Sequence, residues 1–323
     1  MRFFCPDLTQ GTDQQFYFIV NAILALSARH LSLSHAASEE QRDRNIGLKY
    51  YYETLHYLQN AMSYDSYTTS LELLATALIV STYEMLDDIG SGWERHLKGV
   101  FWIQRSQVIQ GESGGLRSAV WWAWLRQDVW AAFRERRKTL SFWTPTKAYN
   151  MLTPHEIALR SVWVFARAVD YCSKEEIKDG EQNLQSRIEK GEIVLEMLDE
   201  WERNLTIEFV PLPVDRDFGR EGFKPIWINP PAFGTLLMPY GLLPLTRLGV
   251  SIQLNCAARI LLLLHKPSLG GRRGFMEQQQ LLSKAVNTIC GIAMTLSDDA
   301  SSLMSSQCLF IGKPRAIYNE IRS

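Results

Sequence analysis

Adjacent carboxylates are the first candidates for chemistry, because paired acids can hold a metal ion or share acid–base work. The chain has two such pairs, Asp87-Asp88 and Asp298-Asp299. A magnesium site of the isoprenoid type needs aspartates repeated at helical spacing on one face, and neither pair has an acidic residue three or four positions further on. We therefore predict solvated helix ends at both pairs rather than a metal site.

Serine catalysis and phosphate binding depend on glycine-containing turns that follow a strand. The strings nearest to a nucleophile elbow, Gly90-Ser91-Gly92 and the segment 111–115, lack its spacing. The segment 270–274 holds two arginines between glycines but no Walker lysine pattern. All three are predicted to be turns or surface loops, with phosphate binding at 270–274 as the alternative.

Cysteine and histidine spacing bears on zinc and disulfide chemistry. The five cysteines are far apart, the closest pair being eighteen positions apart, and the six histidines are scattered as well. No C-x2-C or H-x3-H pair occurs, although a structural zinc site is usually built from such pairs. We predict thiols that are small core residues in a reducing compartment, and no cofactor or metal in this chain.

A tryptophan-rich block is the most unusual local feature, because aromatic rings interleaved with arginine can stack nucleobases. At helical spacing Trp121 and Trp124 face one way, whereas Trp122, Arg126 and Trp130 face another. That pattern is typical of a helix buried on two sides and favours a core role. An apolar ligand pocket or a groove for a partner is the alternative.

Four cations crowd the end of the same predicted helix, with Glu135 alone opposing them. They are Arg134, Arg136, Arg137 and Lys138. Cations interact favourably with the dipole at a helix C-terminus, which explains the cluster without a function. A nuclear-import signal or a docking patch for an anionic partner is the functional alternative, so these residues and the tryptophan-rich block are the candidate interaction residues.

Composition limits the classes of partner. The chain has 323 residues, of which 46% are hydrophobic, and its 34 basic side chains nearly balance 35 acidic ones, for a formal net charge of -1. This composition is that of a globular protein and not of a disordered one. Without a basic field over the whole chain, direct binding to nucleic acid is not indicated.

Apolar spacing of three and four residues predicts helices almost throughout. Clear stripes occupy 71–85, 93–101, 194–205 and 282–296, and capping boxes are predicted at Thr153 with Glu156 and at Ser173 with Glu176. The segments 16–33 and 242–264 are apolar on nearly every face and are predicted to cross the centre of a bundle. The fold class is therefore all-α, a large bundle of about ten helices, with one short extended piece near 226–228.

Proline placement divides the chain, since a proline inside a helix removes a hydrogen bond and clashes with the preceding turn. Seven of the twelve prolines lie between Pro211 and Pro244. We expect a long Pro-rich connection at 208–240 between helical blocks at 13–207 and 241–312, within a single domain. The apolar run 16–28 is too short to span a bilayer, and no membrane association is expected.

Several segments resemble the fungal-specific transcription factor domain. The most specific are 96–107, 114–137 and 141–147, and the segments 23–30, 256–261 and 289–293 are similar as well. The resemblance extends from about residue 16 to about residue 312, and the tryptophan-rich block is its most specific part.

The resemblance implies a nuclear, non-enzymatic protein that modulates transcription by RNA polymerase II. Implied partners are proteins of the transcription machinery, a related regulator, or a small-molecule effector. The family's DNA-reading module holds two zinc ions with six closely spaced cysteines, the Zn2Cys6 arrangement, and nothing here matches it. Zinc is therefore expected only in that module, and DNA contact only indirectly.

Two other functions remain open at this point. The first is an all-helical small-molecule-binding protein or enzyme with an apolar, tryptophan-lined pocket. The second is a truncated regulator that acts without binding DNA directly.

Overall fold

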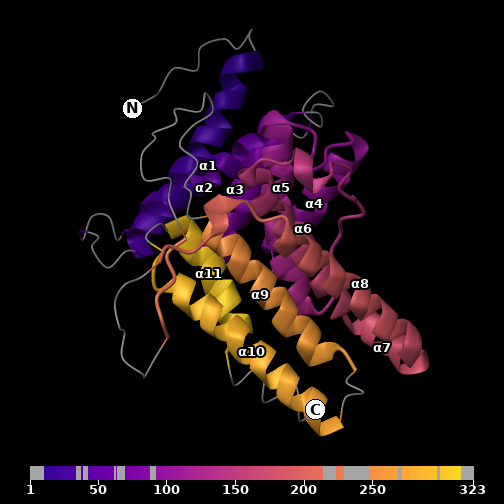
Figure 1. Cartoon of the computed structure of the whole chain (residues 1–323). Coiled ribbons are helices and arrows are strands. Elements are labelled where there is room, and N and C mark those ends of the chain that lie inside the picture. The colour runs from indigo at the N-terminus through magenta and orange to yellow at the C-terminus, as the bar shows by residue number, and fades with distance from the viewer. Residues whose placement is uncertain are drawn as a thin grey trace, which may run out of the picture. The chain divides into compact units, whose positions relative to one another are not determined.

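The computed structural model describes residues 11–33, 38, 43–61, 63, 70–87, 92–213, 223–228, 247–267, 271–296 and 299–313. Within these ranges the chain forms eleven α-helices, which confirms the all-α prediction (Figure 1). Asp88, Gly90, Ser91, Gly270 and Asp298 lie outside the described residues. The helices are α1 (Gly11–Leu33), α2 (Arg44–Ala61), α3 (Leu71–Asp87), α4 (Gly92–Ser106), α5 (Gly115–Glu135), α6 (Pro154–Tyr171), α7 (Lys174–Gln182), α8 (Leu184–Arg203), α9 (Arg247–His265), α10 (Gly271–Ala293) and α11 (Asp299–Ile311).

The contacts between residues divide the chain into two compact units. Unit 1 comprises residues 1–128 and 140–145, and unit 2 comprises 129–139 and 146–323. The boundary therefore falls inside α5. Of the expected Pro-rich connection at 208–240, the structure describes 208–213 and 223–228, which belong to unit 2, and the remainder lies outside the described residues.

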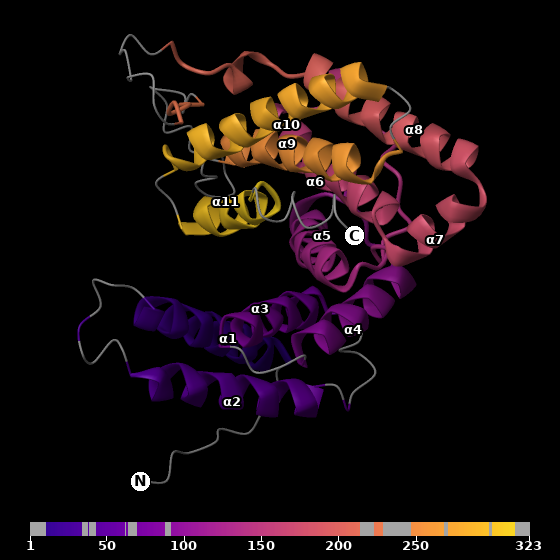
Figure 2. The same cartoon turned by 90° about the horizontal axis from the view of Figure 1, so that it is seen from below.

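In unit 1, α1 packs against α2 and α3, and α3 packs against α4 (Figure 2). Tyr51 and Tyr83 stack with ring centroids 4.8 Å apart in the core of α1 to α3. The prediction that 16–33 crosses the centre of a bundle is wrong, because Tyr17, Ile23 and Leu31 are exposed. Only the face of α1 toward α2 and α3 is buried, so apolar residues around a helix do not by themselves place it centrally.

Acidic side chains of α3 form a buried polar cluster in unit 1. The carboxylate of Asp87 is fully buried and pairs with Arg29 Nε at 2.8 Å and with Arg44 Nη2 at 2.7 Å. The Tyr51 hydroxyl donates to Glu84 at 2.7 Å, and His96 lies 3.1 Å from the same oxygen. The prediction of a solvated helix end is thus wrong for Asp87, because two arginines neutralise its charge and allow burial.

In unit 2, α9 is the central helix, as its apolar sequence predicts. It contacts α6, α8, α10 and α11, and Figure 2 shows it between α6 and α10. Its segment Leu248–His265 is long and apolar enough to cross a membrane by composition alone, but 67% of that segment is buried inside the structure. Such burial is typical of a core helix in a globular unit.

The predicted helix starts and the extended piece are found in unit 2. Thr153 and Glu156 form a reciprocal capping box at α6. Ser173 caps α7 by accepting from the Glu176 amide, but the capping box predicted there is incomplete, because the Glu176 carboxylate pairs with Lys138 and Lys190. The extended piece at 226–228 pairs with the chain after α8 through an isolated antiparallel bridge between Pro211 and Ile228. It also packs on α10, since the Ile226 amide donates to the Gly291 carbonyl at 2.9 Å.

None of the four described cysteines is in a disulfide; Cys172 and Cys308 are buried, as predicted for small core residues, whereas Cys256 and Cys290 are half-buried. Burial raises the pKa of Cys256 to about 12 and raises that of Cys308 as well. Within the described ranges, no group of three or more His, Cys, Asp or Glu side chains is placed to hold a metal ion.

Candidate functional site

Three of the four tryptophans of α5 lie in the core of unit 1. Trp121, Trp122 and Trp124 are all buried, and Arg126 is half-buried. The indole nitrogen of Trp124 donates to the Leu97 carbonyl at 3.0 Å, and that of Trp122 donates to the Gly111 carbonyl at 3.1 Å. Because both indole nitrogens are bonded internally and the rings are covered, this part of the block does not form a surface for stacking nucleobases.

The rings of Trp121, Trp122 and Trp143 meet edge to face around Gly111, with centroids 4.7 to 5.8 Å apart. Gly111 lies in the turn between α4 and α5, and the Ser118 hydroxyl donates to its carbonyl at 2.6 Å. A Cβ atom at Gly111 would lie 2.8 Å from Trp143 and 3.0 Å from Trp122. The turn predicted at 111–115 is thus confirmed, and its first glycine is there because the indoles leave no room for a side chain.

Replacing Gly111 by alanine is expected to lower the free energy of unfolding by about 2 kcal/mol, within the usual cost of overpacking a rigid core. Urea unfolding monitored by circular dichroism measures the loss. The control is Gly99→Ala on α4, where an added Cβ meets nothing within 4 Å. Alanine at Gly99 is expected to be neutral or stabilising, since alanine has the higher helix propensity. Equal losses in the two variants would contradict the packing argument.

Trp130 and the basic segment 134–138 belong to unit 2. The half-buried Trp130 ring stacks on Phe133 at 5.4 Å and meets Phe310 of α11 edge to face at 6.0 Å. The candidate residues are therefore divided between the two units. The first four, Trp121, Trp122, Trp124 and Arg126, belong to unit 1.

The basic segment begins with a C-terminal cap on α5. The Arg137 amide donates to the Ala132 carbonyl at 3.0 Å, and the Arg136 amide donates to the Phe133 carbonyl at 3.3 Å, which is the Schellman pattern. Arg136 occupies the left-handed position of this cap, with φ of 55°, where glycine is usual. The cap turns the chain sharply, so successive basic side chains leave in different directions.

The cations of the segment make different contacts. Arg137 pairs with Glu135 at 2.5 Å, and Lys138 pairs with Glu176 of α7 at 2.8 Å. Arg134 and Arg136 are the exposed members of the segment. The four basic residues are therefore not one uniform patch, and the helix-dipole explanation does not account for Lys138, which contacts another helix.

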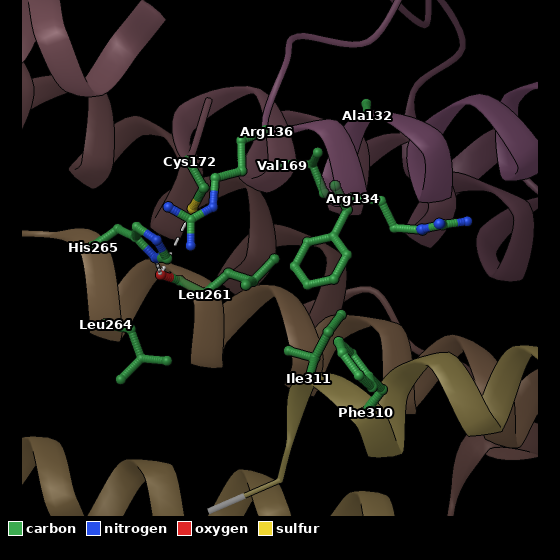
Figure 3. A pocket seen from close by; sticks show the side chains of 11 residues that line it. Ala132, Arg134, Arg136, Val169, Cys172, Leu261, Leu264, His265, Phe310 and Ile311 are labelled. Atoms are coloured by element: carbon green, nitrogen blue, oxygen red, sulfur yellow. Dashed lines mark hydrogen bonds between the residues drawn. The ribbon is translucent and has the colours of Figure 1, made fainter. Parts of the chain in front are cut away.

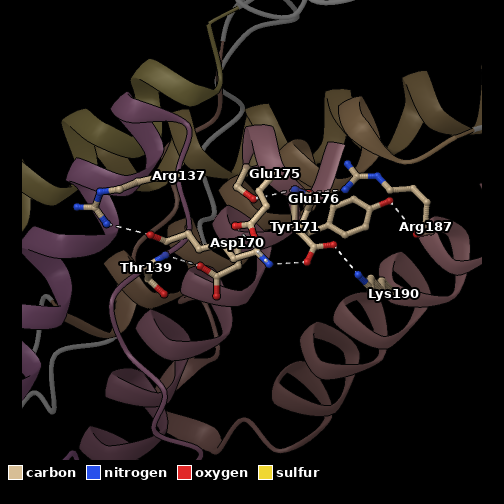
Figure 4. A network of polar contacts seen from close by, with 10 residues as sticks. Arg137, Thr139, Asp170, Tyr171, Glu175, Glu176, Arg187 and Lys190 are labelled. Carbon is tan, nitrogen blue, oxygen red and sulfur yellow. Dashed lines mark hydrogen bonds and ion pairs between the residues drawn. The ribbon is translucent and has the colours of Figure 1, made fainter. Parts of the chain in front are cut away.

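A polar network ties this segment to α6, α7 and α8 (Figure 4). Glu176 bridges Lys138 and Lys190, the second at 2.7 Å. Burial by itself would raise the pKa of Glu176, but hydrogen bonds from these two lysines hold it below its ordinary value. The network therefore keeps the carboxylate of Glu176 charged and fixes the segment to α7.

Asp170 of α6 contacts the chain at Thr139, directly after the basic segment. Its carboxylate accepts from the Thr139 amide at 2.6 Å and pairs with Arg167 at 3.0 Å. Burial nevertheless raises the pKa of Asp170 above its ordinary value, against the opposing effect of Arg167. The Lys174 amide also donates to the Arg136 carbonyl at 2.9 Å, so the backbone of the segment is bound at both ends.

A cavity of about 300 Å³ lies beside the basic segment in unit 2 (Figure 3). Figure 3 shows the Arg136 side chain beside Cys172 and His265, whereas the Arg134 guanidinium extends away from them. The Nδ1 atom of His265 lies 2.8 Å from the Leu261 carbonyl oxygen. The walls are mainly apolar and consist of Ala132, Phe133, Val169, Leu261, Leu264, Phe310 and Ile311.

The sequence did not indicate Cys172 or His265 as site residues. Cys172 caps the end of α6, and His265 lies in the last turn of α9, so only the packing of these helices brings them together. An apolar cavity with guanidinium groups at its edge can hold an anionic group attached to an apolar body.

Comparison with known proteins gives one match. The family model described as the fungal specific transcription factor domain matches residues 1–119. Over these residues, which are about a third of the chain, the sequence is similar to that family. No curated protein and no solved structure matches the chain.

The matched part of the chain contains α1 to α4 and the beginning of α5. It ends before Trp121, so the tryptophan-rich block and the basic segment lie beyond the match, and the resemblance of residues 120–312 to the family stays a prediction. The match supports a role as a fungal transcription regulator, and the family is known as a regulatory domain and not as a family of enzymes.

Proposed function

We propose that this chain is a regulatory and interaction domain that modulates transcription by RNA polymerase II in the fungal nucleus. It acts by binding a protein partner of the transcription machinery, a related regulator, or a small effector, and it meets DNA only through other modules. The observation that carries this proposal is the family match over residues 1–119.

The unit 2 cavity supports a binding role. Its lining combines apolar side chains from α5, α6, α9 and α11 with Arg134 and Arg136. A partner or effector that presents a carboxylate on an apolar body matches both properties, because the Arg136 guanidinium would pair with the anion while the body fills the cavity. The Schellman cap and the contacts of Lys138 and Thr139 hold this edge of the cavity in place.

A reporter assay tests the proposal. The full chain is fused to a heterologous DNA-binding module, and transcription from a reporter with the matching sites is compared with that driven by the module alone. We expect the fusion to change transcription, and we expect Arg134→Glu with Arg136→Glu to reduce that change, because the double substitution reverses the charge at the cavity. The matched control is Lys178→Glu, an exposed cation on α7.

The proposal fails if the wild-type fusion is well expressed, nuclear and without effect on the reporter. If wild-type and Lys178→Glu fusions are active and the double variant is equally active, the regulatory role stands and the assignment of the cavity is wrong. Circular dichroism of the purified variants checks that folding is retained, as is usual for surface substitutions.

A further inference from the structure

A second cleft, of about 270 Å³, lies in unit 1 at the end of α4. Its floor and walls come from α4, from the turn that follows it, from α5 and from the segment 141–143. Aromatic rings make up much of the lining. The lining side chains that bear on its chemistry are Phe101, Gln104, Arg105, Trp121, Trp124 and Phe142.

Gln104 is the unusual residue of this cleft. Its side chain is 2% exposed, and neither the amide nitrogen nor the amide oxygen has a hydrogen-bond partner among the residues that the structure describes. Burial of a carboxamide without partners is costly, so buried polar groups in folded proteins are almost always bonded. An amide with both groups unpaired beside a cleft indicates a partner that comes from outside the chain.

The remaining lining is flat and apolar. Phe101 and Trp124 stack with centroids 5.8 Å apart and an interplanar angle of 20°, and Trp121 lies beside Trp124. The indole nitrogen of Trp124 is already bonded to Leu97. At the buried end of the cleft, the Gln104 carboxamide could therefore bond to a ligand that has one donor and one acceptor side by side.

The rim can open at small cost. Phe142 is 78% exposed and is held at the rim by Arg105, whose guanidinium carbon lies 5.5 Å from its ring centroid. Since little of the Phe142 ring is buried, its displacement gives up little apolar contact. The amide atoms of Gln104 are sealed from solvent, so a ligand has to displace lining side chains to reach them.

Backbone strain occurs at the same place. Val108 has φ of 54°, in the left-handed region that β-branched residues avoid. It ends α4 in a Schellman cap in which the Ile109 amide donates to the Gln104 carbonyl at 3.0 Å. Strained residues of this kind cluster where a ligand is clamped, and the strain and the unpaired amide thus lie at one end of one helix.

We propose that the unit 1 cleft binds a small, flat aromatic molecule that carries an amide-type N–H beside a carbonyl, paired with the Gln104 carboxamide. The ring lies against Phe101 and the buried tryptophans, and Phe142 with Arg105 covers it. This site is separate from the proposed transcriptional role. It can be tested independently, because binding is measured on the purified chain without DNA or a reporter.

Calorimetric titration of the purified full chain with 2-quinolone tests the proposal. Quinoline is the comparison compound, because it has the same two fused rings but lacks the N–H and carbonyl pair. We expect 2-quinolone to bind the wild-type chain at least about tenfold more tightly than quinoline, which corresponds to the loss of one buried hydrogen-bonding pair. Gln104→Leu should abolish that preference, while the matched substitution Gln185→Leu on exposed α8 should retain it.

Thermal unfolding without ligand gives an independent readout. Gln104→Leu removes both unpaired groups at nearly constant volume, so its Tm should rise by about 2 °C or more, while Gln185→Leu should leave Tm unchanged. The proposal is overturned if 2-quinolone shows no binding or no preference in the wild-type chain, or if Gln104→Leu keeps the preference. A lower Tm for Gln104→Leu would also overturn it, because the amide would then have a stabilising partner within the fold.

Discussion

Replacing Trp124 by alanine is expected to lower the free energy of unfolding by about 3 to 5 kcal/mol, the range for removing a large buried aromatic ring. Trp124 is 1% exposed, its ring stacks on Phe101, and its indole nitrogen donates to the Leu97 carbonyl at 3.0 Å. The substitution leaves a cavity and removes that hydrogen bond. Urea unfolding monitored by circular dichroism measures the change.

Trp102→Ala is the matched control for this prediction. Trp102 lies on α4, also contacts Phe101, and is 62% exposed. Its loss is expected to cost less than about 1 kcal/mol, since little area leaves a buried environment. A small effect at Trp124, or equal effects at the two positions, would show that the α5 tryptophans are not the packing centre of unit 1.

Replacing Asp87 by asparagine is expected to cost about 3 kcal/mol, because removal of one member of a buried ion pair leaves its partners without a counter-charge. Asp87 is the common partner of Arg29 on α1 and Arg44 on α2. The substitution keeps the shape of the side chain and removes its charge. The same unfolding measurement gives the loss.

The control for Asp87 is Glu181→Gln, a carboxylate-to-amide change at an exposed position of α7, where the expected change is within about 0.5 kcal/mol. Replacing Arg44 by glutamine should cost less than replacing Asp87, since the Arg44 side chain is half exposed and Arg29 still neutralises the carboxylate. If Asp87→Asn behaves like Glu181→Gln, the charge of Asp87 does not hold α1, α2 and α3 together.

Periodicity predicted the helices whose buried face is apolar. The stripes at 71–85, 93–101, 194–205 and 282–296 correspond to α3, α4, α8 and α10, and the capping box at Thr153 is present at α6. The buried face of α11 consists instead of Ser301, Ser305, Cys308 and Ile311. Small polar residues on a buried face give no apolar stripe, so no hydrophobic pattern marked this helix.

Contacts between residues far apart in the sequence explain why the burial of Asp87 was not predicted. Asp87 meets Arg44 across 43 positions, so its burial could not be deduced from neighbouring residues. One signal was present, since Glu84 and Asp87 lie three positions apart on an otherwise apolar helix and both are buried. Two acids on the buried face of a helix require basic or hydroxyl partners from other elements, and Arg29, Arg44, Tyr51 and His96 supply them.

The sequence predicted the burial of the α5 tryptophans but not the arrangement of the basic segment. The helical spacing of the tryptophans favoured a core role, and Trp121, Trp122 and Trp124 are buried. The basic segment was read as one cluster, whereas the Schellman cap sends its side chains toward different partners. Gln104 was missed because a lone glutamine carries no pattern, and only the burial of its amide without a partner distinguishes it.

The burial of Cys308 in α11 makes the reactivity of its thiol depend on opening of that helix. Burial raises the pKa of Cys308, so its thiolate is scarce at neutral pH, and the thiolate is the form that reacts with alkylating and oxidising reagents. Modification of Cys308, which is 1% exposed, should therefore be slow in the folded chain and limited by transient opening of α11. The rate of Cys308 alkylation would report how often α11 opens, without an introduced cysteine.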